Sequence, residues 1–358
     1  MINLKAIEEL SNAFGPPGFE DNVVEVIKKY STGVEVEVDS MNNVFTRLHG
    51  NKGNRPVIML DCHTDELGFM VQAITPKGLI KFLPLGGWII TNVPAHAVII
   101  QNSRGEFIKG VTTSKPPHFM SEADREKRLV IEDIYIDVGA TSRDEVLNDF
   151  AIEPGNPIVP DVTFQYNKNN GVFLGKAFDN RMGCFCIIDV MQRLRHENLN
   201  IDVVGAFAVQ EEVGMRGAAV TSRIVKPDLA IVFEGSPADD IYYDKFTAQG
   251  CLKEGTQIRH IDKSMISNPH FIKFAKEVAK VKEIAFQSAV RAMGSTNAGI
   301  IHVSNKGVPT LVLGIPTRYA HTHYCYSAEF DVAATVDLAV EVIKNLTEEK
   351  VKELLKLK

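Results

Sequence analysis

Two adjacent glutamates, Glu211 and Glu212, follow an apolar run at residues 203–209 and precede a glycine-rich turn that starts at Gly214. The run is typical of a β-strand, so the two carboxylates stand where a strand ends and a turn begins. Neighbouring side chains of an extended chain point to opposite sides. One carboxylate can therefore hold a cation while the other faces a bound water and moves its proton. The pair indicates the chemistry of a metal-dependent hydrolase.

Other residues of metal-binding type stand directly after predicted strands or a few positions beyond them. Ligands of open α/β sheets bind at this end of the strands. The candidates are His63, Glu212, Glu234 and His321, which follow apolar runs at residues 57–61, 202–209, 228–233 and 310–314. A fifth candidate, Asp179, lies in a turn that opens a predicted helix, where Asp is also a common N-cap.

Sequence context decides how these candidates are interpreted. An isolated histidine is more often an ordinary hydrogen-bonding residue than a ligand, but Asp65 stands two positions after His63 and can hold its other ring nitrogen, as metal-bound imidazoles usually require. The carboxylate of Glu234 follows an apolar run, where burial is costly unless the group is paired or binds metal. Polar residues are ordinary in loops, so no role is assigned to His323, Asp239, Asp240 or Asp244.

The charges of this set suit two divalent cations. Two such ions carry four positive charges, whereas Asp179, Glu212 and Glu234 supply three negative charges and a bridging hydroxide a fourth. One bridging aspartate, with one histidine and one carboxylate on each ion, gives a nitrogen and oxygen donor set that is typical for zinc and possible for cobalt or manganese. Glu211 then accepts the proton of the shared water.

Helices and strands alternate on both sides of a β-rich segment, which predicts an α/β sheet. The predicted helices span residues 4–14, 20–30, 181–196, 218–224, 269–281 and, with a break near Thr347, 332–358. Short segments separated by Gly, Pro and Asn turns predict the β-rich insert, with strands at 69–74, 97–101, 131–138 and 162–166. The predicted organisation is a catalytic domain at residues 1–66 and 169–358, interrupted by an insert at 67–168.

Composition excludes several classes of protein. The net charge of −6 and the pI near 6.0 give no basic surface for nucleic acid. No apolar stretch approaches the roughly 20 residues that span a bilayer, so we expect no membrane partner and a cytoplasmic location. The five cysteines are odd in number and scattered, which indicates reduced thiols rather than a disulfide framework.

Four motifs in one order resemble those of the M42 family of cocatalytic metallo-aminopeptidases, which includes the TET, glutamyl and deblocking aminopeptidases. They are His63-Thr-Asp-Glu-Leu-Gly-Phe69, Ala177-Phe-Asp-Asn-Arg-Met-Gly183, Gln210-Glu-Glu-Val-Gly-Met-Arg-Gly217 and Thr317-Arg-Tyr-Ala-His321. The resemblance runs through nearly the whole chain.

The resemblance implies a role for each candidate. Asp179 would bridge two metal ions, with His63 and Glu234 completing one site. Glu212 and His321 would complete the other site. Glu211 would be the general base, and Asp65 the partner that orients His63.

The resemblance also implies a fold, an activity and an assembly. The fold would be a mixed central sheet flanked by helices, with the β-rich insert as a PDZ-like dimerisation domain. The activity would be removal of N-terminal residues from peptide substrates by a water that bridges the two ions. The protein would be a homo-oligomer built from dimers, up to a dodecamer.

Three positions depart from the family pattern. Glu234 stands where Asp is more common, and Asn297 in Gly294-Ser-Thr-Asn-Ala-Gly299 replaces an acidic residue. The segment after His321 is longer than the usual form. Substrate selectivity can therefore differ. Three basic residues that could favour an acidic substrate side chain are Lys245, Arg259 and Arg318, but exposed basic residues usually serve solubility, so the sequence leaves the preferred N-terminal residue open.

Other functions share parts of this pattern. An N-acyl amino-acid or peptide deacylase of the related dinuclear type would use the same metals on a blocked amine. An endoglucanase needs two carboxyl groups about 5 to 9.5 Å apart and has no use for His63 and His321. A non-catalytic assembly or binding protein on the same fold would bind substoichiometric metal and hydrolyse no aminoacyl substrate.

Overall fold

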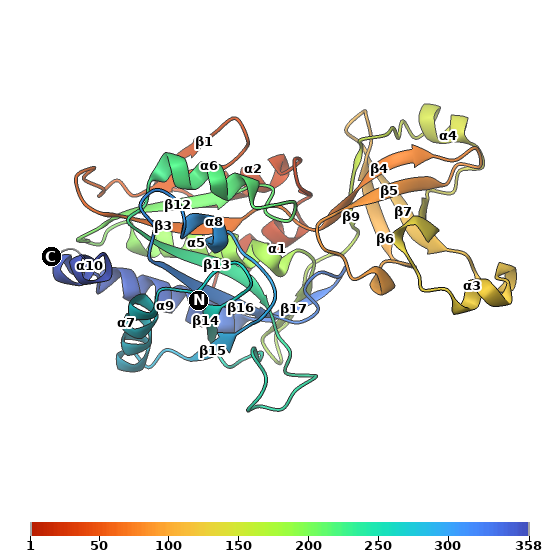
Figure 1. The fold of residues 1–358 in the computed structure, drawn as a ribbon. Helices are drawn as coiled ribbons and strands as arrows, with labels where there is room; N and C mark the ends of the chain where they lie inside the picture. The colour runs from red at the N-terminus through yellow and green to blue at the C-terminus, as the bar shows by residue number, and fades with distance from the viewer. Residues whose placement is uncertain (1, 357–358) are drawn as a thin grey trace.

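The chain folds into two bodies, which the computed structural model describes over residues 2–356. One is an α/β body around a large mixed sheet, and the other is a small closed barrel that projects from one end of it (Figure 1). All strands of the barrel lie between residues 68 and 160, so the α/β body is built from chain segments on both sides of the barrel.

An eight-stranded sheet forms the centre of the α/β body. In spatial order its strands are β1 (Glu35–Val38), β2 (Val44–Arg47), β12 (Asp202–Ala208), β3 (Val57–His63), β13 (Leu229–Pro237), β16 (Thr310–Thr317), β14 (Thr256–Ile261) and β15 (Phe286–Val290). The four central strands β12, β3, β13 and β16 run parallel to one another. β2 and β14 pair with this group in antiparallel fashion. The predicted mixed α/β fold is confirmed.

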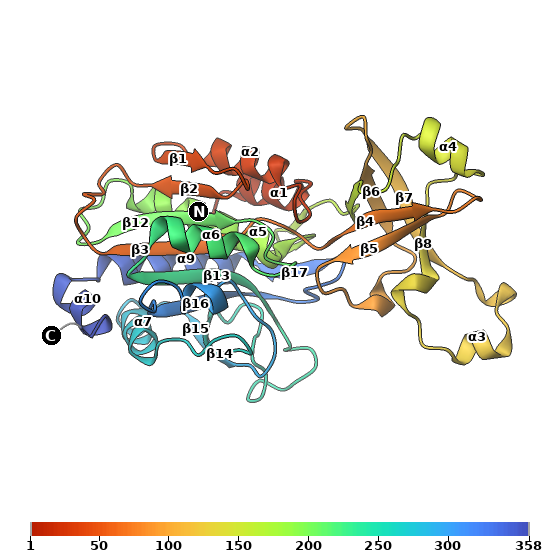
Figure 2. The same ribbon diagram turned by 45° about the horizontal axis from the view of Figure 1, so that its top comes forward.

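Helices cover both faces of this sheet (Figure 2). Because side chains of a strand alternate between faces, Leu229 and Ile231 of β13 enter one apolar layer and Ala230 and Val232 enter the other. The larger layer is shared with α1 (Leu4–Asn12), α2 (Asp21–Tyr30), α5 (Phe178–Leu194), α7 (Pro269–Val281), α9 (Glu329–Lys344) and α10 (Glu348–Leu354). The alanine-rich layer is shared with α6 (Arg216–Val225) and α8 (Ala298–Ile301).

Most predicted elements of the α/β body occur within a few residues of their predicted ends. The helix predicted at 269–281 is α7, with the same bounds. The helix predicted at 332–358 begins earlier, at Glu329, and is interrupted between Lys344 and Glu348, as the predicted break requires. Residues 357 and 358 of that prediction lie outside the described residues.

One predicted strand end was wrong, and it concerns a candidate ligand. The strand predicted to end before Glu234 continues to Pro237, because Glu234 and the three residues after it keep pairing with β16. Glu234 therefore lies within β13, opposite Gly314, rather than in a loop after the strand.

The β-rich segment forms a closed six-stranded barrel. Around the barrel the strands are β4 (Gly68–Ile74), β5 (Ile80–Leu85), β8 (Ile134–Asp137), β7 (Phe107–Ser114), β6 (Ala97–Gln101) and β9 (Pro157–Pro160). Its buried core is apolar, and its helices α3 (Glu122–Glu126) and α4 (Arg143–Asn148) are short. Whether this part is PDZ-like and dimerises stays a prediction.

A third, small sheet joins the return from the barrel to the C-terminal part of the chain. It consists of β10 (Gln165–Asn167), β11 (Val172–Gly175) and β17 (Cys325–Ala328). β10 overlaps the strand predicted at 162–166, and it pairs with β11 rather than with a barrel strand.

Two predictions about the chain as a whole can be compared with residues 2–356. None of the helices in that range combines the length and the apolar character needed to cross a bilayer. The five cysteines are unpaired, although the sulfur atoms of Cys62 and Cys184 lie 3.6 Å apart in the core.

Candidate metal centre and active site

The five candidate ligands come together at one edge of the central sheet. Because the carboxyl ends of the four parallel strands share this edge, residues far apart in sequence meet there. His63 ends β3, Glu234 lies in β13, Glu212 follows β12, His321 follows β16, and Asp179 lies at the start of α5.

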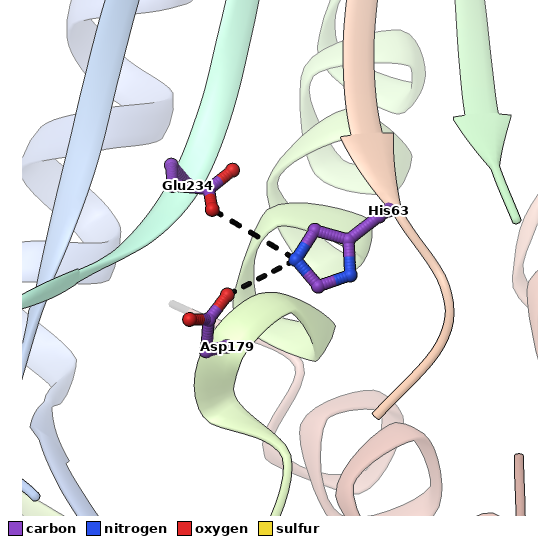
Figure 3. A group of neighbouring side chains, drawn as sticks. All are labelled: His63, Asp179 and Glu234. Atoms are coloured by element: carbon purple, nitrogen blue, oxygen red, sulfur yellow. Dashed lines mark hydrogen bonds and ion pairs between the residues drawn. The ribbon is translucent and has the colours of Figure 1, made fainter. Parts of the chain in front are cut away.

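Asp179 lies at the centre of the group. Its Oδ1 is 3.1 Å from Nε2 of His63, and its Oδ2 is 3.5 Å from Nε2 of His321. Oε1 of Glu234 is 3.8 Å from the same His63 nitrogen, as Figure 3 shows. Potential ligand atoms of His63, Asp179 and Glu234 lie within 4.8 Å of one another, as do those of Asp179, Glu212 and His321. These two groups share only Asp179, and a third group of the same kind consists of His63, Glu211 and Glu212.

The backbone around Asp179 departs from a helix so that this side chain can reach both histidines. Asp179 has φ −85° and ψ 102°, and regular helix begins after Asn180. Gly235 of β13 makes room for this turn, since a Cβ there would lie 2.5 Å from the Cα of Asp179. Asn180 donates from Nδ2 to the Phe233 carbonyl at 2.8 Å and to Glu234 Oε2 at 3.2 Å, which ties the turn to β13.

Asp65 contacts both His63 and the turn that carries the two glutamates. Its main-chain oxygen lies 3.1 Å from Nδ1 of His63, and its carboxylate Oδ1 lies 3.5 Å from that nitrogen. The carboxylate also accepts the backbone N–H of Glu211 at 2.9 Å and that of Glu212 at 3.0 Å. Asp65 therefore fixes the position of the glutamate pair as well as the ring of His63.

His321 is oriented by a residue between two barrel strands. Its Nδ1 donates to the carbonyl of Gly87 at 2.8 Å, so Nε2 is the ring nitrogen that faces Asp179. Gly87 lies between β5 and β6, next to Trp88, whose Nε1 donates to the Gly68 carbonyl at 2.9 Å. The barrel thus supplies a backbone acceptor that sets the tautomer of a candidate ligand.

Crowding of buried carboxyl groups at the site shifts their pKa values strongly. Burial raises the pKa of Glu211 to about 7 and that of Glu212 to about 8, and it raises the pKa of Glu234 well above its ordinary value. For Asp179, burial acts in the same direction, but its hydrogen bonds with His321 and His63 outweigh it and lower the pKa. The cluster has more acidic groups than nearby protein cations can neutralise.

The side chains present fit two divalent cations. Glu212 Oε1 is buried without a hydrogen-bond partner among residues 2–356, which is costly unless a ligand contacts it. Three carboxylates and two imidazoles form a mixed oxygen and nitrogen donor set that suits zinc and related ions. His63 and His321 also have the partners on their other ring nitrogens that metal-bound histidines usually have.

A pocket of about 800 Å³ opens onto the cluster. Its walls include Asp179, Glu211, Glu212, Glu234 and His321. The lining also includes two arginines, one further acidic residue and several neutral side chains, among them Arg259, Arg291, Asp239, Tyr243, Thr247, Gln249 and Met293. The pocket is large enough for one or two residues of a peptide.

The three basic residues singled out from the sequence differ in where they lie. Arg318 pairs with Asp240 at 2.7 Å and does not line the pocket, and Lys245 is exposed. Arg259 does line the pocket. Sequence reasoning missed Arg291, which follows β15, a strand that was not predicted.

Sequence reasoning also missed the buried residues that hold the site loops in place. Arg181 donates to the carbonyl of Thr64 at 2.7 Å and to Glu66 at 3.2 Å. Glu66 also pairs with Lys176 at 2.6 Å. This ion group joins the loop after His63 to the turn before α5, and its only sequence signal is that Glu66 and Arg181 lie inside the motifs.

Asn297, which replaces an acidic residue of the family pattern, lies beside a buried acid on a neighbouring element. Asn297 donates from Nδ2 to Oδ1 of Asp61 at 2.8 Å, and both residues are buried. Burial raises the pKa of Asp61 to about 8. The acidic group of this pair lies on β3, two residues before His63, and the amide lies on the loop before α8.

Known proteins resemble this chain over nearly its whole length. A family model described as M42 glutamyl aminopeptidase matches residues 42–338. A glutamyl aminopeptidase of Lactococcus lactis is 32% identical over 354 residues, which are 98% of each chain. A lysyl aminopeptidase of Pyrococcus furiosus is 30% identical over 97% of this chain and 98% of its own.

Solved structures agree with these relatives. The crystal structure of a TET aminopeptidase from a Thaumarchaeota archaeon is 35% identical and superposes with a TM-score of 0.94, covering 98% of this chain and 99% of its own. The family model covers far more than half of the chain, and the relatives match at both ends. The chain therefore belongs to the M42 family of metal-dependent aminopeptidases, and it is a peptide hydrolase.

Proposed function

We propose that this protein is an aminopeptidase that uses two divalent metal ions to hydrolyse the first peptide bond of its substrates. The observation that carries the proposal is the position of Asp179, whose two carboxylate oxygens face Nε2 of His63 and Nε2 of His321. One ion would be held by His63, Glu234 and Asp179. The other would be held by Glu212, His321 and the same Asp179.

When bound, the ions would supply a water of lowered pKa and polarise the scissile carbonyl. The chain supplies the proton transfer. Glu211 lies in the pocket beside the proposed ligands, with Oε2 4.0 Å from His63 Nε2, and its carboxylate also lies within 4.8 Å of potential ligand atoms of His63 and Glu212. Its carboxylate accepts the proton of the attacking water and returns it to the leaving amine nitrogen.

The experiment that tests this proposal replaces Glu211 with glutamine. Glu211→Gln keeps the size of the side chain and removes the base, so we expect turnover to fall by about 10²- to 10⁴-fold. Bound metal, measured by elemental analysis, should stay at the wild-type ratio. Glu8→Gln, an exposed change on α1, is the control.

Two outcomes would contradict the assignments. Equal loss of metal and turnover in Glu211→Gln would make Glu211 a ligand rather than the base. Hydrolysis of N-acetylated peptides in preference to free ones would favour the deacylase. Hydrolysis is therefore measured with chromogenic aminoacyl substrates whose amine is either free or acetylated. Each substrate is tested after chelation and again with added zinc, cobalt or manganese.

The pocket supports a finer proposal, that the first side chain of the substrate is acidic. Arg259 and Arg291 line the pocket, and each has a buried Nε without a partner among the described residues. Arg259 is held in place by Asp262 at 3.1 Å, and Arg291 donates to the Pro237 carbonyl. A substrate carboxylate in the pocket would pair with the positive charge of these guanidinium groups, and the Lactococcus relative is named for glutamyl substrates.

Arg291→Met tests this selectivity. A hydrogen bond to a charged group contributes about 1.5–3 kcal/mol, so kcat/KM for a glutamyl substrate should fall about 10- to 100-fold relative to a leucyl substrate. Arg318→Met is the matched control, because Arg318 pairs with Asp240 and does not line the pocket. An unchanged ratio in Arg291→Met would refute the acidic preference and leave the metal proposal untouched.

A homo-oligomer built from dimers and a cytoplasmic location stay predictions. Sedimentation of the purified protein distinguishes a monomer, a dimer and a dodecamer.

A further inference from the structure

The turn that carries Glu211 is held by carboxylates through three successive backbone N–H groups. Asp65 accepts two of them, from Glu211 and Glu212. The third, from Gln210, donates to Oε1 of Glu20 at 3.2 Å, across 190 positions of sequence. Gln210 has φ +55°, a left-handed conformation that is unfavourable for a residue with a side chain. This turn therefore needs an external partner to keep its shape.

Apart from its contact with Gln210, the Glu20 carboxylate holds the turn just before α2. It is 1% exposed and stands at the N-cap position of α2, yet its side chain makes no capping hydrogen bond to that helix. Oε1 accepts the N–H of Gly18 at 2.8 Å in addition to that of Gln210. Burial of the group, together with nearby Asp65, raises the pKa of Glu20 to about 7. A buried carboxyl without a cationic partner is costly, so a compensating function is expected.

We propose that Glu20 is a positioning residue for the general base: by holding the N–H of Gln210, it sets the direction of Glu211 toward the attacking water. The inference rests on the proposed role of Glu211. Glu20 is not among the residues that line the pocket, and its carboxylate accepts hydrogen bonds from Gly18 and Gln210. Its loss frees the Gln210 N–H and lets the turn rotate, and misplacement of a catalytic group by about 1 Å can cost about 10²-fold in rate.

Side-chain length and charge can be separated at this position. Glu20→Gln keeps an acceptor oxygen at the same reach, whereas Glu20→Asp keeps the charge but is one carbon shorter. With the metal-loaded enzyme we expect Glu20→Gln to keep kcat within about threefold of wild type. Glu20→Asp and Glu20→Ala should lower kcat about 10- to 100-fold, with KM and bound metal unchanged. Glu25→Ala, an exposed change on α2, is the control.

A double-mutant cycle shows whether Glu20 acts through the base. If it does, adding Glu20→Asp to Glu211→Gln lowers kcat no further, because the base it positions is already absent. Multiplied losses in the double variant would overturn the proposal, as would equal losses in Glu20→Gln and Glu20→Asp. Full activity of Glu211→Gln alone would instead refute the base assignment in the proposed function, so the two failures are distinguishable.

Discussion

The barrel and the site edge of the α/β sheet differ in what they bury. Among the described side chains of residues 68–160, none of the buried ones is ionisable, and the two buried polar residues, Asn102 and Thr112, are hydrogen-bonded. The site edge buries Asp61, His63, Asp65 and Glu234 within a short distance of one another. Buried charge lowers stability unless it is compensated. The difference indicates that the barrel is optimised for packing, whereas the sheet edge keeps costly groups for chemistry.

The largest expected effect comes from the residue shared by both proposed metal sites. Asp179→Asn removes the charge that faces both histidines, so we expect both ions to bind more weakly. Loss of a residue that hydrogen-bonds to a metal ligand typically lowers activity roughly 10- to 100-fold. We expect Asp179→Asn to lower activity by more than this. Elemental analysis and kcat measure the two effects, and circular dichroism checks the fold.

Asp189→Asn, on the same helix α5 and paired with Arg193, controls for a change of charge alone. Retention of two ions and full activity by Asp179→Asn would show that Asp179 is not needed to hold the metal ions.

A smaller effect on activity, but a clear effect on stability, is expected in the barrel. Ile136 of β8 is fully buried in the barrel core. Ile136→Ala removes apolar contacts and leaves a cavity, so unfolding free energy should fall by about 2–5 kcal/mol while kcat of the folded enzyme stays unchanged.

Val111→Ala, at a half-exposed position on β7, should change stability by about 0.5 kcal/mol or less. Denaturant unfolding followed by circular dichroism measures both variants. If Ile136→Ala lowered kcat of the folded enzyme, barrel packing would be coupled to the chemistry, and the contrast between the two regions would be weaker.

The smallest expected effect is a pH dependence at a buried acid away from the site. Asp331 on α9 accepts the backbone N–H groups of Lys253 and Gly255, both at 2.8 Å, and burial raises its pKa to about 7. Because the folded-state pKa lies above the ordinary value, the folded state holds this proton more tightly than the unfolded state. Its contribution to stability is therefore full at acidic pH and is lost as pH rises through about 7.

Asp331→Asn cannot titrate, so the stability of wild type relative to this variant should decrease between pH 4 and pH 8. Asp337→Asn, exposed on the same helix, should show no such trend. Melting temperatures across this pH range measure the difference. A flat difference would mean that the pKa of Asp331 is not raised in the folded state, and that its hydrogen bonds with Lys253 and Gly255 compensate the burial of this acid.

The candidate ligands could be predicted because strand ends leave a clear sequence signal. His63, Glu212 and His321 each follow an apolar run, and parallel strands bring such positions to one edge. Glu234 was found in the same way although its strand continues past it, since pairing with β16 and not hydropathy decides where β13 ends.

What could not be predicted depends on contacts between distant segments. Gly87 contributes only a backbone carbonyl, so its side chain gives no signal. Arg291 reaches the pocket because β15 pairs at the sheet edge, and strands there are short and partly exposed. Strand β1, with the sequence Glu-Val-Glu-Val, was missed for the same reason. Glu20 resembles an ordinary helix-start residue until the turn at Gln210 is placed beside it.

The hydrogen bond from His321 to Gly87 has a consequence for how this architecture can change over time. A barrel that only packed beside the sheet could be exchanged between relatives, or deleted, as a separable module. Here the segment between β5 and β6 supplies the acceptor that orients His321, so a shortened protein would keep all five proposed ligand side chains and lose the tautomer of one. Recombination that preserves activity must therefore carry Gly87 together with the barrel, or place an equivalent carbonyl beside His321.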